Sequence, residues 1–217
     1  MRVIPLHLPP GHLRLVCLGA HPDDIEIGFG ATLLTLAEAR EVSVTVVVAT
    51  GADGERREEA VKAVARFLPA AEAEVNVLGF RDGFLPSDWG TVKEAFEQIA
   101  RSETADVVFA PRRDDAHQDH RVVAELATTV WRDALVMRYE IPKWDGDLRH
   151  VSHYVPLTPE IAHRKIELLD ECFPSQVGRD WWSAETFLGL MRLRGVECRS
   201  RYAEAFLIDK AIIALSS

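Results

Sequence analysis

Apolar and polar residues alternate in blocks along the first 131 residues of the chain. Four apolar runs are short, mostly rich in β-branched side chains, and of the length expected for buried strands: residues 13–19, 42–49, 74–78 and 106–110. After each run and a short loop comes a stretch with helical spacing of apolar residues: residues 28–40, 55–68, 89–102 and 119–131. This repeated order predicts a Rossmann-like, doubly wound α/β fold, with a mostly parallel sheet and helices on both faces.

The last third of the chain is less regular. It predicts short strands at residues 136–140, 151–155 and 205–208, and helices at residues 159–172 and 181–194. Thr158 followed by Pro159 is typical of a helix start, because threonine caps the first turn and proline suits the first helical position. Without repeats or linkers in the sequence, we expect residues 1–217 to form a single domain.

A polar motif follows the first predicted strand. It contains His21, Pro22, Asp23 and Asp24. In a doubly wound sheet, ligands bind outside the carboxyl ends of the strands, where this motif lies. An imidazole and a carboxylate on stiff backbone are the ligands that a zinc-type metal needs, so His21 and Asp24 are candidate ligands. Asp23 cannot point the same way as Asp24, which leaves it available as a general base.

A second polar cluster follows the fourth predicted strand and includes His117, Asp119 and His120. The two histidines are three residues apart at a helix start, so both can face one centre. Either could be the third metal ligand, and the other would donate a proton or stabilise an oxyanion. Asp119 could orient and charge that histidine. Alone, each cluster also fits an ordinary polar turn, but together they favour a Zn²⁺ site, with Fe²⁺ as the alternative metal.

Composition and charge limit the kinds of partner that we expect this protein to bind. The net charge of −9 argues against a nucleic-acid binder, which needs a basic surface for phosphates. No apolar run reaches the roughly 18 residues of a membrane span, and no signal peptide is recognisable. The three cysteines, Cys17, Cys172 and Cys198, are widely spaced and are expected to be reduced thiols. We therefore expect a cytoplasmic protein with a small-molecule partner, and leave a homo-oligomer open.

The two motifs together carry a family resemblance. AHPDD after an apolar strand, followed far downstream by the His-x-Asp-His cluster HQDH, resembles the LmbE/PIG-L family of zinc-dependent N-acetylglucosaminyl deacetylases. The segments GFRDGFLP, APRRDDAHQDHR, YEIPKWDGDL, ETFLGLMRLRGVE and YAEAF are similar to one bacterial branch of that family. The resemblance therefore covers most of the chain and implies an α/β deacetylase.

The resemblance also implies roles for the motif residues. It makes His21, Asp24 and His120 the zinc ligands and Asp23 the general base for a zinc-activated water. The implied reaction is removal of an acetyl group from an N-acetylglucosamine-containing small molecule or glycoconjugate. Hydrolysis of another amide, such as that of a thiol-sugar conjugate, is the alternative reaction.

Further residues are assigned only through the resemblance. Protonated His117 would stabilise the oxyanion or protonate the leaving amine, with Asp119 as its partner. Arg56 and Asp82 would bind sugar hydroxyls, although Arg57 stands beside Arg56 and could take its place. One departure is Gly51-Ala52, where many members of the family have Gly-Glu, so a sugar contact from that loop is missing or remade.

The two motifs argue against two other classes of protein. A nucleotide-binding module would need a glycine-rich first loop to approach a pyrophosphate, and the acidic motif at 21–24 argues against it. A metal-binding α/β protein without catalysis is opposed by the presence of both Asp23 and His117. Trp144 and the pair Trp181-Trp182 could form a sugar-stacking wall, but packing in the core is the favoured interpretation.

Overall fold

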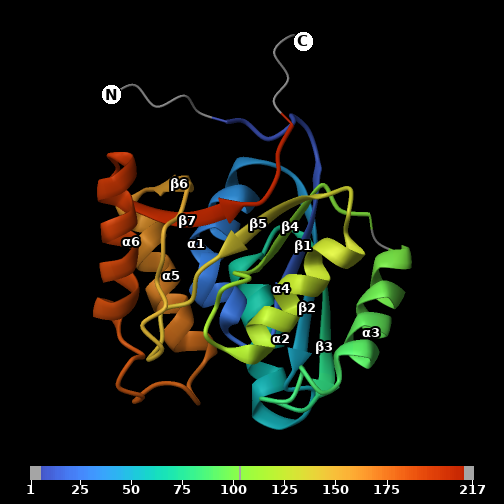
Figure 1. The fold of residues 1–217 in the computed structure, drawn as a ribbon. Coiled ribbons are helices and arrows are strands. Elements are labelled where there is room, and N and C mark those ends of the chain that lie inside the picture. The colour runs from blue at the N-terminus through green and yellow to red at the C-terminus, as the bar shows by residue number, and fades with distance from the viewer. Residues whose placement is uncertain (1–5, 103, 213–217) are drawn as a thin grey trace.

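The computed structural model describes residues 6–102 and 104–212, and its seven strands form one sheet with the order β3-β2-β1-β4-β5-β7-β6 (Figure 1). The strands are β1 (Leu13–Gly19), β2 (Val42–Thr50), β3 (Glu72–Phe80), β4 (Val107–Pro111), β5 (Leu135–Tyr139), β6 (His153–Leu157) and β7 (Tyr202–Ile208). The first five strands pair in parallel, and β7 runs antiparallel to both β5 and β6. The predicted doubly wound, mostly parallel α/β fold is confirmed.

Helices cover both faces of the sheet. They are α1 (Asp24–Ala39), α2 (Gly54–Phe67), α3 (Trp89–Ser102), α4 (Gln118–Val130), α5 (Pro159–Cys172) and α6 (Ala184–Cys198). Buried apolar residues of α1, α2, α5 and α6 share one core with one sheet face, and those of α3 and α4 share a second core with the other face (Figure 1). Within the described part of the chain, no helix is both long and apolar enough to cross a membrane.

Most predicted elements are present, and the largest differences are at the start of α1 and at both ends of α6, which ends at Cys198 and not at 194. The helix predicted at 28–40 begins at Asp24, because the acidic motif opens the helix instead of preceding it. The helix predicted at 181–194 begins at Ala184, where the Ser183 hydroxyl accepts the Thr186 amide hydrogen. The cap predicted at Thr158 is confirmed, since its hydroxyl accepts a hydrogen bond from the Ile161 amide at 3.3 Å.

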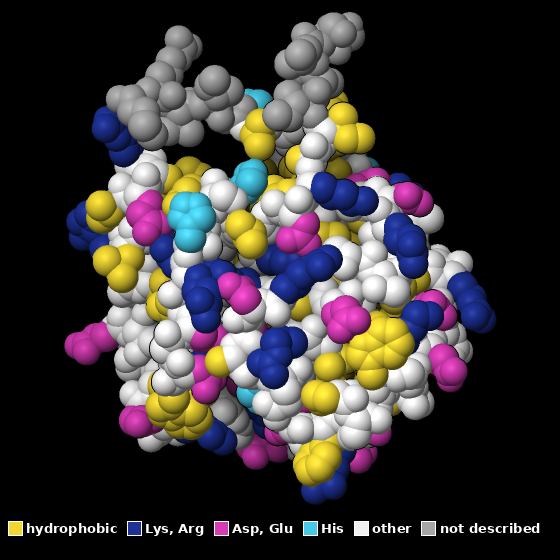
Figure 2. All heavy atoms as spheres, in the orientation of Figure 1, with side chains coloured by type: hydrophobic (Ala, Val, Ile, Leu, Met, Phe, Trp, Pro, Cys, Tyr) yellow, Lys and Arg dark blue, Asp and Glu magenta, His cyan; other side chains and the backbone are white. Residues whose placement is uncertain are grey.

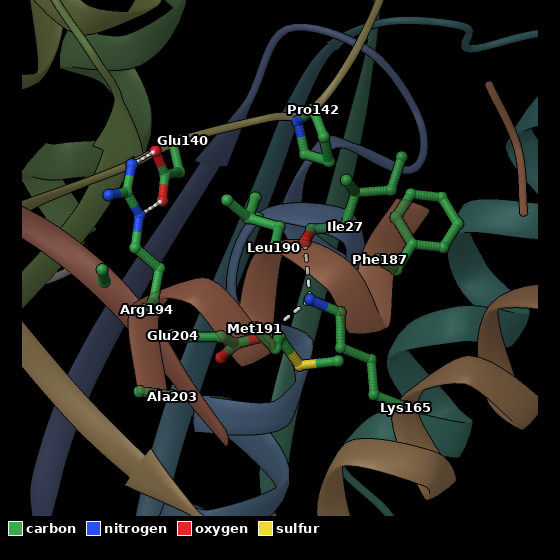
Figure 3. Close-up of a pocket in the computed structure, with 12 residues that line it drawn as sticks. Ile27, Glu140, Pro142, Lys165, Phe187, Leu190, Met191, Arg194, Ala203 and Glu204 are labelled. Carbon is green, nitrogen blue, oxygen red and sulfur yellow. Dashed lines mark hydrogen bonds and ion pairs between the residues drawn. The ribbon is translucent and has the colours of Figure 1, made fainter. Parts of the chain in front are cut away.

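Helix α1 is interrupted at Phe29, whose backbone is not helical. The amides of Ala31 and Thr32, just beyond the interruption, donate to the buried Glu204 carboxylate on β7 at 3.1 and 2.6 Å. The Lys165 amine on α5 lies between that carboxylate, 2.7 Å away, and the Ile27 carbonyl, 2.6 Å away (Figure 3). This buried ion pair therefore replaces the backbone hydrogen bonds that the interruption removes, and Glu204 does not reach the metal-ligand candidates.

A cavity of about 10 Å³ lies beside this pair, lined also by the Arg194–Glu140 pair and by Phe187 and Met191 (Figure 3). It is barely large enough for one water molecule. Arg194 donates two hydrogen bonds to the Glu140 carboxylate, at 2.7 and 2.8 Å. Because all four charged groups here are paired with one another, the cavity belongs to the structural support of α1.

Gly28 is required by the packing of the first turns of α1 on β5. A Cβ atom at this position would overlap the ring of buried Tyr139, whose hydroxyl donates to the Leu18 carbonyl at 2.7 Å. We expect Gly28→Ala to lower the free energy of unfolding by about 1–3 kcal/mol, the usual cost of overpacking a core. Chemical denaturation followed by circular dichroism measures the change.

Gly189 provides the matched control, because it also lies inside a helix but has open space around its Cα. Gly189→Ala should raise the free energy of unfolding by about 0.5–1 kcal/mol, since alanine is the better helix former. A rise in stability in both variants would show that helix propensity, and not the contact with Tyr139, determines the effect at Gly28.

Candidate active site

The two polar motifs meet because their strands are neighbours. Strand β1 pairs in parallel with β4, so the loops at their carboxyl ends lie side by side. The His21 Nδ1 atom is 3.2 Å from His120 Nε2, although the residues are 99 positions apart in the chain. The sheet therefore assembles one site from the two loops.

Three side chains converge within this site. His21 Nδ1 lies 3.5 Å from Asp24 Oδ2, and His120 Nε2 lies 3.3 Å from Asp24 Oδ1. Ligand atoms about 2.0–2.2 Å from a tetrahedral metal are about 3.3–3.6 Å from one another, from the geometry of a tetrahedron. Two imidazoles and one carboxylate at these separations fit a tetrahedral divalent ion with one position left open.

The Asp24 carboxylate is fixed by the backbone of its own loop. Its Oδ2 atom accepts hydrogen bonds from the amides of Ala20 and His21, both at 2.8 Å. Burial favours the neutral acid, but the His120 and His21 imidazoles outweigh it and hold the Asp24 pKa well below its usual value. Asp24 is therefore a preformed anionic group, which a cation can neutralise.

His120 has a carboxylate partner that the sequence did not single out. Its Nδ1 atom lies 3.1 Å from Asp115 Oδ2, on the side of the ring opposite Asp24. Asp115 also accepts the His117 amide hydrogen at 2.8 Å and pairs with the Lys143 amine at 3.0 Å. Such a carboxylate fixes the orientation of a ligating histidine and increases its basicity. The position in a DDAHQDH run offers no signal that separates Asp115 from Asp114.

His117 also reaches the site, as the N-terminal cap of α4. Its Nδ1 atom accepts the Asp119 amide hydrogen at 3.2 Å, so the neutral ring carries its hydrogen on Nε2. Burial, together with the positive charge of His120 and His21, lowers the His117 pKa. The ligand atoms of His21, His117 and His120 all lie within 4.8 Å of one another, so His117 borders the site.

Asp119 takes a different partner from the one expected. Its fully buried carboxylate accepts the amide hydrogens of Gly83 and Leu85, at 2.7 and 3.1 Å, and lies 3.3 Å from His21 Nε2. The link to His117 runs through the Asp119 amide and not through its carboxylate. Asp119 therefore ties the loop after β3 to the site, where exposed Asp82 lies 3.0 Å from His21 Nε2.

Asp23 points away from Asp24, as its position after Pro22 predicts. Its backbone has φ 106°, a strained value for a residue other than glycine. The carboxylate is buried and lies 2.9 Å from the Arg56 guanidinium. Burial raises the Asp23 pKa to about 7, with Arg56 opposing the shift and Asp24 adding to it. Such a group can accept and release a proton near neutral pH.

Arg56 occupies the inward position, whereas neighbouring Arg57 is exposed. The Arg56 guanidinium donates to the Pro22 carbonyl and, at 2.7 Å, to the buried Glu59 carboxylate. Glu59 in turn accepts from the amide and hydroxyl of Ser175, both at 2.8 Å. Arg56 is thus held by the protein beside Asp23, which favours it over Arg57 as the arginine of the site.

The loop after β2 approaches the motif closely at Gly51, which has φ 84°. A Cβ atom there would lie 2.6 Å from the Pro22 ring. Glycine is therefore required both by the backbone conformation and by the contact. The following residue, Ala52, supplies no polar side chain where a glutamate is common in the family that the sequence resembles.

Comparisons with known proteins find a matching family model and a related deacetylase. The family model described as PIG-L, GlcNAc-PI de-N-acetylase, matches residues 16–131, more than half of the chain. The uncharacterized deacetylase YaiS of Escherichia coli (strain K12) is 30% identical over 139 residues, covering 59% of this chain and 74% of YaiS.

Two solved structures share the fold. The conserved protein TT1542 from Thermus thermophilus has a TM-score of 0.72 and 24% identity, over 94% of this chain and 97% of that chain. The N,N'-diacetylchitobiose deacetylase from Pyrococcus horikoshii has a TM-score of 0.70 and 22% identity, over 90% and 83% of the two chains. At these identities the likeness concerns the fold alone.

The contact of Asp119 with the loop after β3 can be tested directly. Asp119→Ala removes the only acceptor shown for the amides of Gly83 and Leu85 among the described residues. We expect hydrogen exchange of these two amides to accelerate at least about tenfold, because unpaired amides open to solvent. Exchange measured by NMR or mass spectrometry over residues 79–88 reports the change.

Asp82→Ala is the control. It removes a carboxylate that belongs to the same loop and lies beside the same histidine, His21. Asp82 accepts no backbone hydrogen bond from the loop in the described structure. Its exchange rates at Gly83 and Leu85 should stay within about twofold of the wild type. Equal acceleration in both variants would mean that loss of charge near His21, and not loss of the acceptor, releases the loop.

Proposed function

The chain belongs to the PIG-L family of GlcNAc-PI de-N-acetylases, and from this membership and the site geometry we propose that it is a metal-dependent amidohydrolase. Its reaction would remove the acetyl group from an N-acetylglucosamine-containing small molecule or glycoconjugate. The observation that carries the proposal is the convergence of His21, Asp24 and His120, with ligand atoms 3.2 to 3.5 Å apart, next to the separately oriented Asp23.

In this proposal His21, Asp24 and His120 hold the metal. Zn²⁺ suits two imidazoles and one carboxylate, and Fe²⁺ accepts the same donors. When bound, such an ion polarises an amide carbonyl and makes a water molecule more acidic. Asp115 orients His120 from the opposite side of its ring, which fixes the ligand before the metal arrives.

The remaining groups divide the proton transfers between them. Asp23 accepts a proton from the attacking water and later delivers it to the leaving amine, as its elevated pKa suits. His117 donates a hydrogen bond from Nε2 to the developing oxyanion, since its Nδ1 atom is occupied by the Asp119 amide. This neutral form replaces the protonated His117 that the resemblance implied. Asp119 acts on this arrangement through its amide and through the loop after β3.

Asp82 and Arg56 are the candidate groups on the substrate side of the site. Exposed Asp82, at the rim beside His21, is placed to accept hydrogen bonds from sugar hydroxyls. Both terminal nitrogens of Arg56 donate to protein acceptors in this structure, so we give it the orientation of Asp23 first and a sugar contact second. The net charge of −9 is compatible with a neutral or cationic small molecule and unfavourable for nucleic acid.

Substitution of Asp23 tests the mechanism. Asparagine is the suitable replacement because it tolerates a positive φ better than alanine does, so the backbone of the motif is retained. We expect Asp23→Asn to lower kcat about 10²–10⁴-fold and to leave bound zinc unchanged. Release of acetate and free amine from N-acetylglucosamine, N,N'-diacetylchitobiose and N-acetylated glycosides of inositol is measured, together with metal content.

Asp53→Asn, an exposed acid at the loop after β2, is the control and should keep wild-type turnover. Near-wild-type release by Asp23→Asn would show that another group is the base. Stoichiometric zinc without amine release from a broad panel of N-acetylated sugars would instead favour a metal-binding protein without catalysis.

Asp115 gives a test of the metal site that does not depend on activity. Asp115→Asn keeps the shape of the side chain but removes the charge that faces His120 Nδ1. We expect the affinity of chelator-treated protein for Zn²⁺ to fall about 10–100-fold, as measured by competition with a chromophoric chelator.

Asp114→Asn is the adjacent control, because Asp114 pairs with Arg112 and its side chain is half exposed. It should bind Zn²⁺ with unchanged affinity. An Asp115→Asn protein that folds normally and binds as tightly as Asp114→Asn would remove Asp115 from the metal site.

A further inference from the structure

An aromatic ridge joins the connection between β5 and β6 to the connection between α5 and α6. We define it as Phe173, Trp182, Trp181 and Trp144. Successive ring centroids are 6.0, 5.5 and 5.8 Å apart, and each pair meets edge to face. Phe173 and Trp182 are buried, and Trp181 is half-buried, in agreement with the favoured core interpretation. Trp144 departs from it, because 65% of the residue is exposed.

The ridge is connected to the candidate active site at both ends. At its buried end the Arg56 guanidinium lies 6.0 Å from the centre of the Phe173 ring and also binds Asp23. At its exposed end Trp144 follows Lys143, whose amine pairs with Asp115 at 3.0 Å. Consecutive Cα atoms are about 3.8 Å apart, so the Trp144 backbone is adjacent to that of Lys143. Lys143 in turn pairs with Asp115, which faces His120.

The segment that carries Trp144 is fixed to the loop after β4. Asp147 accepts the Ala116 amide hydrogen at 2.7 Å and pairs with Lys143 at 2.9 Å. In Figure 1 the connection between β5 and β6 and the connection between α5 and α6 both extend toward the lower end of the sheet, where the parallel strands end. The segment that carries Trp144 therefore borders the loop that holds His117 and His120, beside the candidate active site.

Trp144 is also held in one orientation despite its exposure. Its indole nitrogen donates to Asp180 Oδ1 at 2.9 Å, and its ring meets the Trp181 ring at 71°. Asp180 thus binds the indole nitrogen and Trp181 contacts the ring, while most of Trp144 faces solvent. Figure 2 shows hydrophobic groups among charged ones at the lower left of this face, without a broad continuous apolar area.

We propose that Trp144 is a stacking platform for a second sugar ring, joined to the acetamido sugar that the metal site would take. This inference rests on the proposed function and names its substrate class as a disaccharide or longer glycoside. A pyranose ring presents a flat face of C–H groups, which an oriented, exposed indole can cover. Small-ligand sites combine such aromatic surfaces with a few polar groups, here Asp180 and the half-exposed Asp145.

The surroundings favour a sugar ring over a protein or a lipid. Protein interfaces need apolar patches of several hundred Å², whereas Trp144 lies beside two exposed acids, Asp145 next to it in the chain and Asp180 at its indole nitrogen. A lipid surface would also need several apolar side chains together. One oriented ring with charged neighbours fits a single ring of a polar ligand.

The test compares a one-ring and a two-ring probe. N-acetylglucosamine and N,N'-diacetylchitobiose are offered to the zinc-loaded wild type and to Trp144→Ala, with KM and kcat from amine release and Kd from isothermal titration calorimetry. We expect Trp144→Ala to raise KM and Kd for the disaccharide about tenfold, and to change both by less than about twofold for the monosaccharide. kcat should stay within about twofold, because a remote ring contributes binding in ground state and transition state alike.

Two further variants separate stacking from structure. Trp144→Phe keeps a ring and should restore disaccharide affinity to within about threefold of the wild type. Leu148→Ala removes another exposed apolar side chain from the same connection and should bind both probes as the wild type does. Circular dichroism spectra of all variants should coincide.

Each outcome bears on one proposal or the other. Disaccharide binding that weakens in Trp144→Ala, while the wild type releases no amine from these probes or from the broad panel of N-acetylated sugars, would support the platform and refute the proposed function. Equal effects of Trp144→Ala on both probes, an unchanged disaccharide Kd, or no measurable disaccharide binding by the wild type would overturn the platform.

Discussion

The Asp24 carboxylate is the group on which the geometry of the site depends. It accepts two amides of its own loop through one oxygen and faces His21 and His120 through both, so backbone and side chains are fixed by one anion. That anion lies at the start of α1, and the same helix is interrupted five residues later, at Phe29. The buried ion pair of Lys165 and Glu204 makes the interruption tolerable by satisfying the backbone groups that it frees.

Neighbouring Asp23 shows how the same turn gives two carboxylates different properties. A positive φ turns Asp23 away from the histidines and toward Arg56. Burial there raises the Asp23 pKa, whereas the histidines lower the pKa of Asp24. The strain is held by contacts on both sides, with the Arg56 guanidinium on the Pro22 carbonyl and Glu59 behind it. Backbone strain is typical of functional sites, and here it keeps the proposed base apart from the three proposed metal ligands.

Periodicity and residue chemistry predicted much of this arrangement. The parallel sheet follows from buried strands with crossover helices, and it is the sheet that brings His21 and His120 together. The partners of these groups could not be predicted, because they depend on distances between loops. Asp115 looks no different from Asp114 in sequence, and Asp119 was expected to face His117 but binds the loop after β3 instead. The start of α1 was also missed, since an acidic turn and an acidic first helical turn have the same composition.

The proposed chemistry and the proposed selectivity fall in different parts of the chain. The residues matched by the family model, 16–131, include both polar motifs, with Arg56 and Asp82. Exposed Trp144 and half-buried Trp181 lie beyond that range, on connections that contact the loops of the site without belonging to them. A deacetylase organised in this way can keep its metal ligands and its base unchanged while the later connections alter what is joined to the acetylated sugar. The residues that select the second ring should therefore be sought at 140–150 and 173–183. The residues that carry out the reaction should be sought within 16–131.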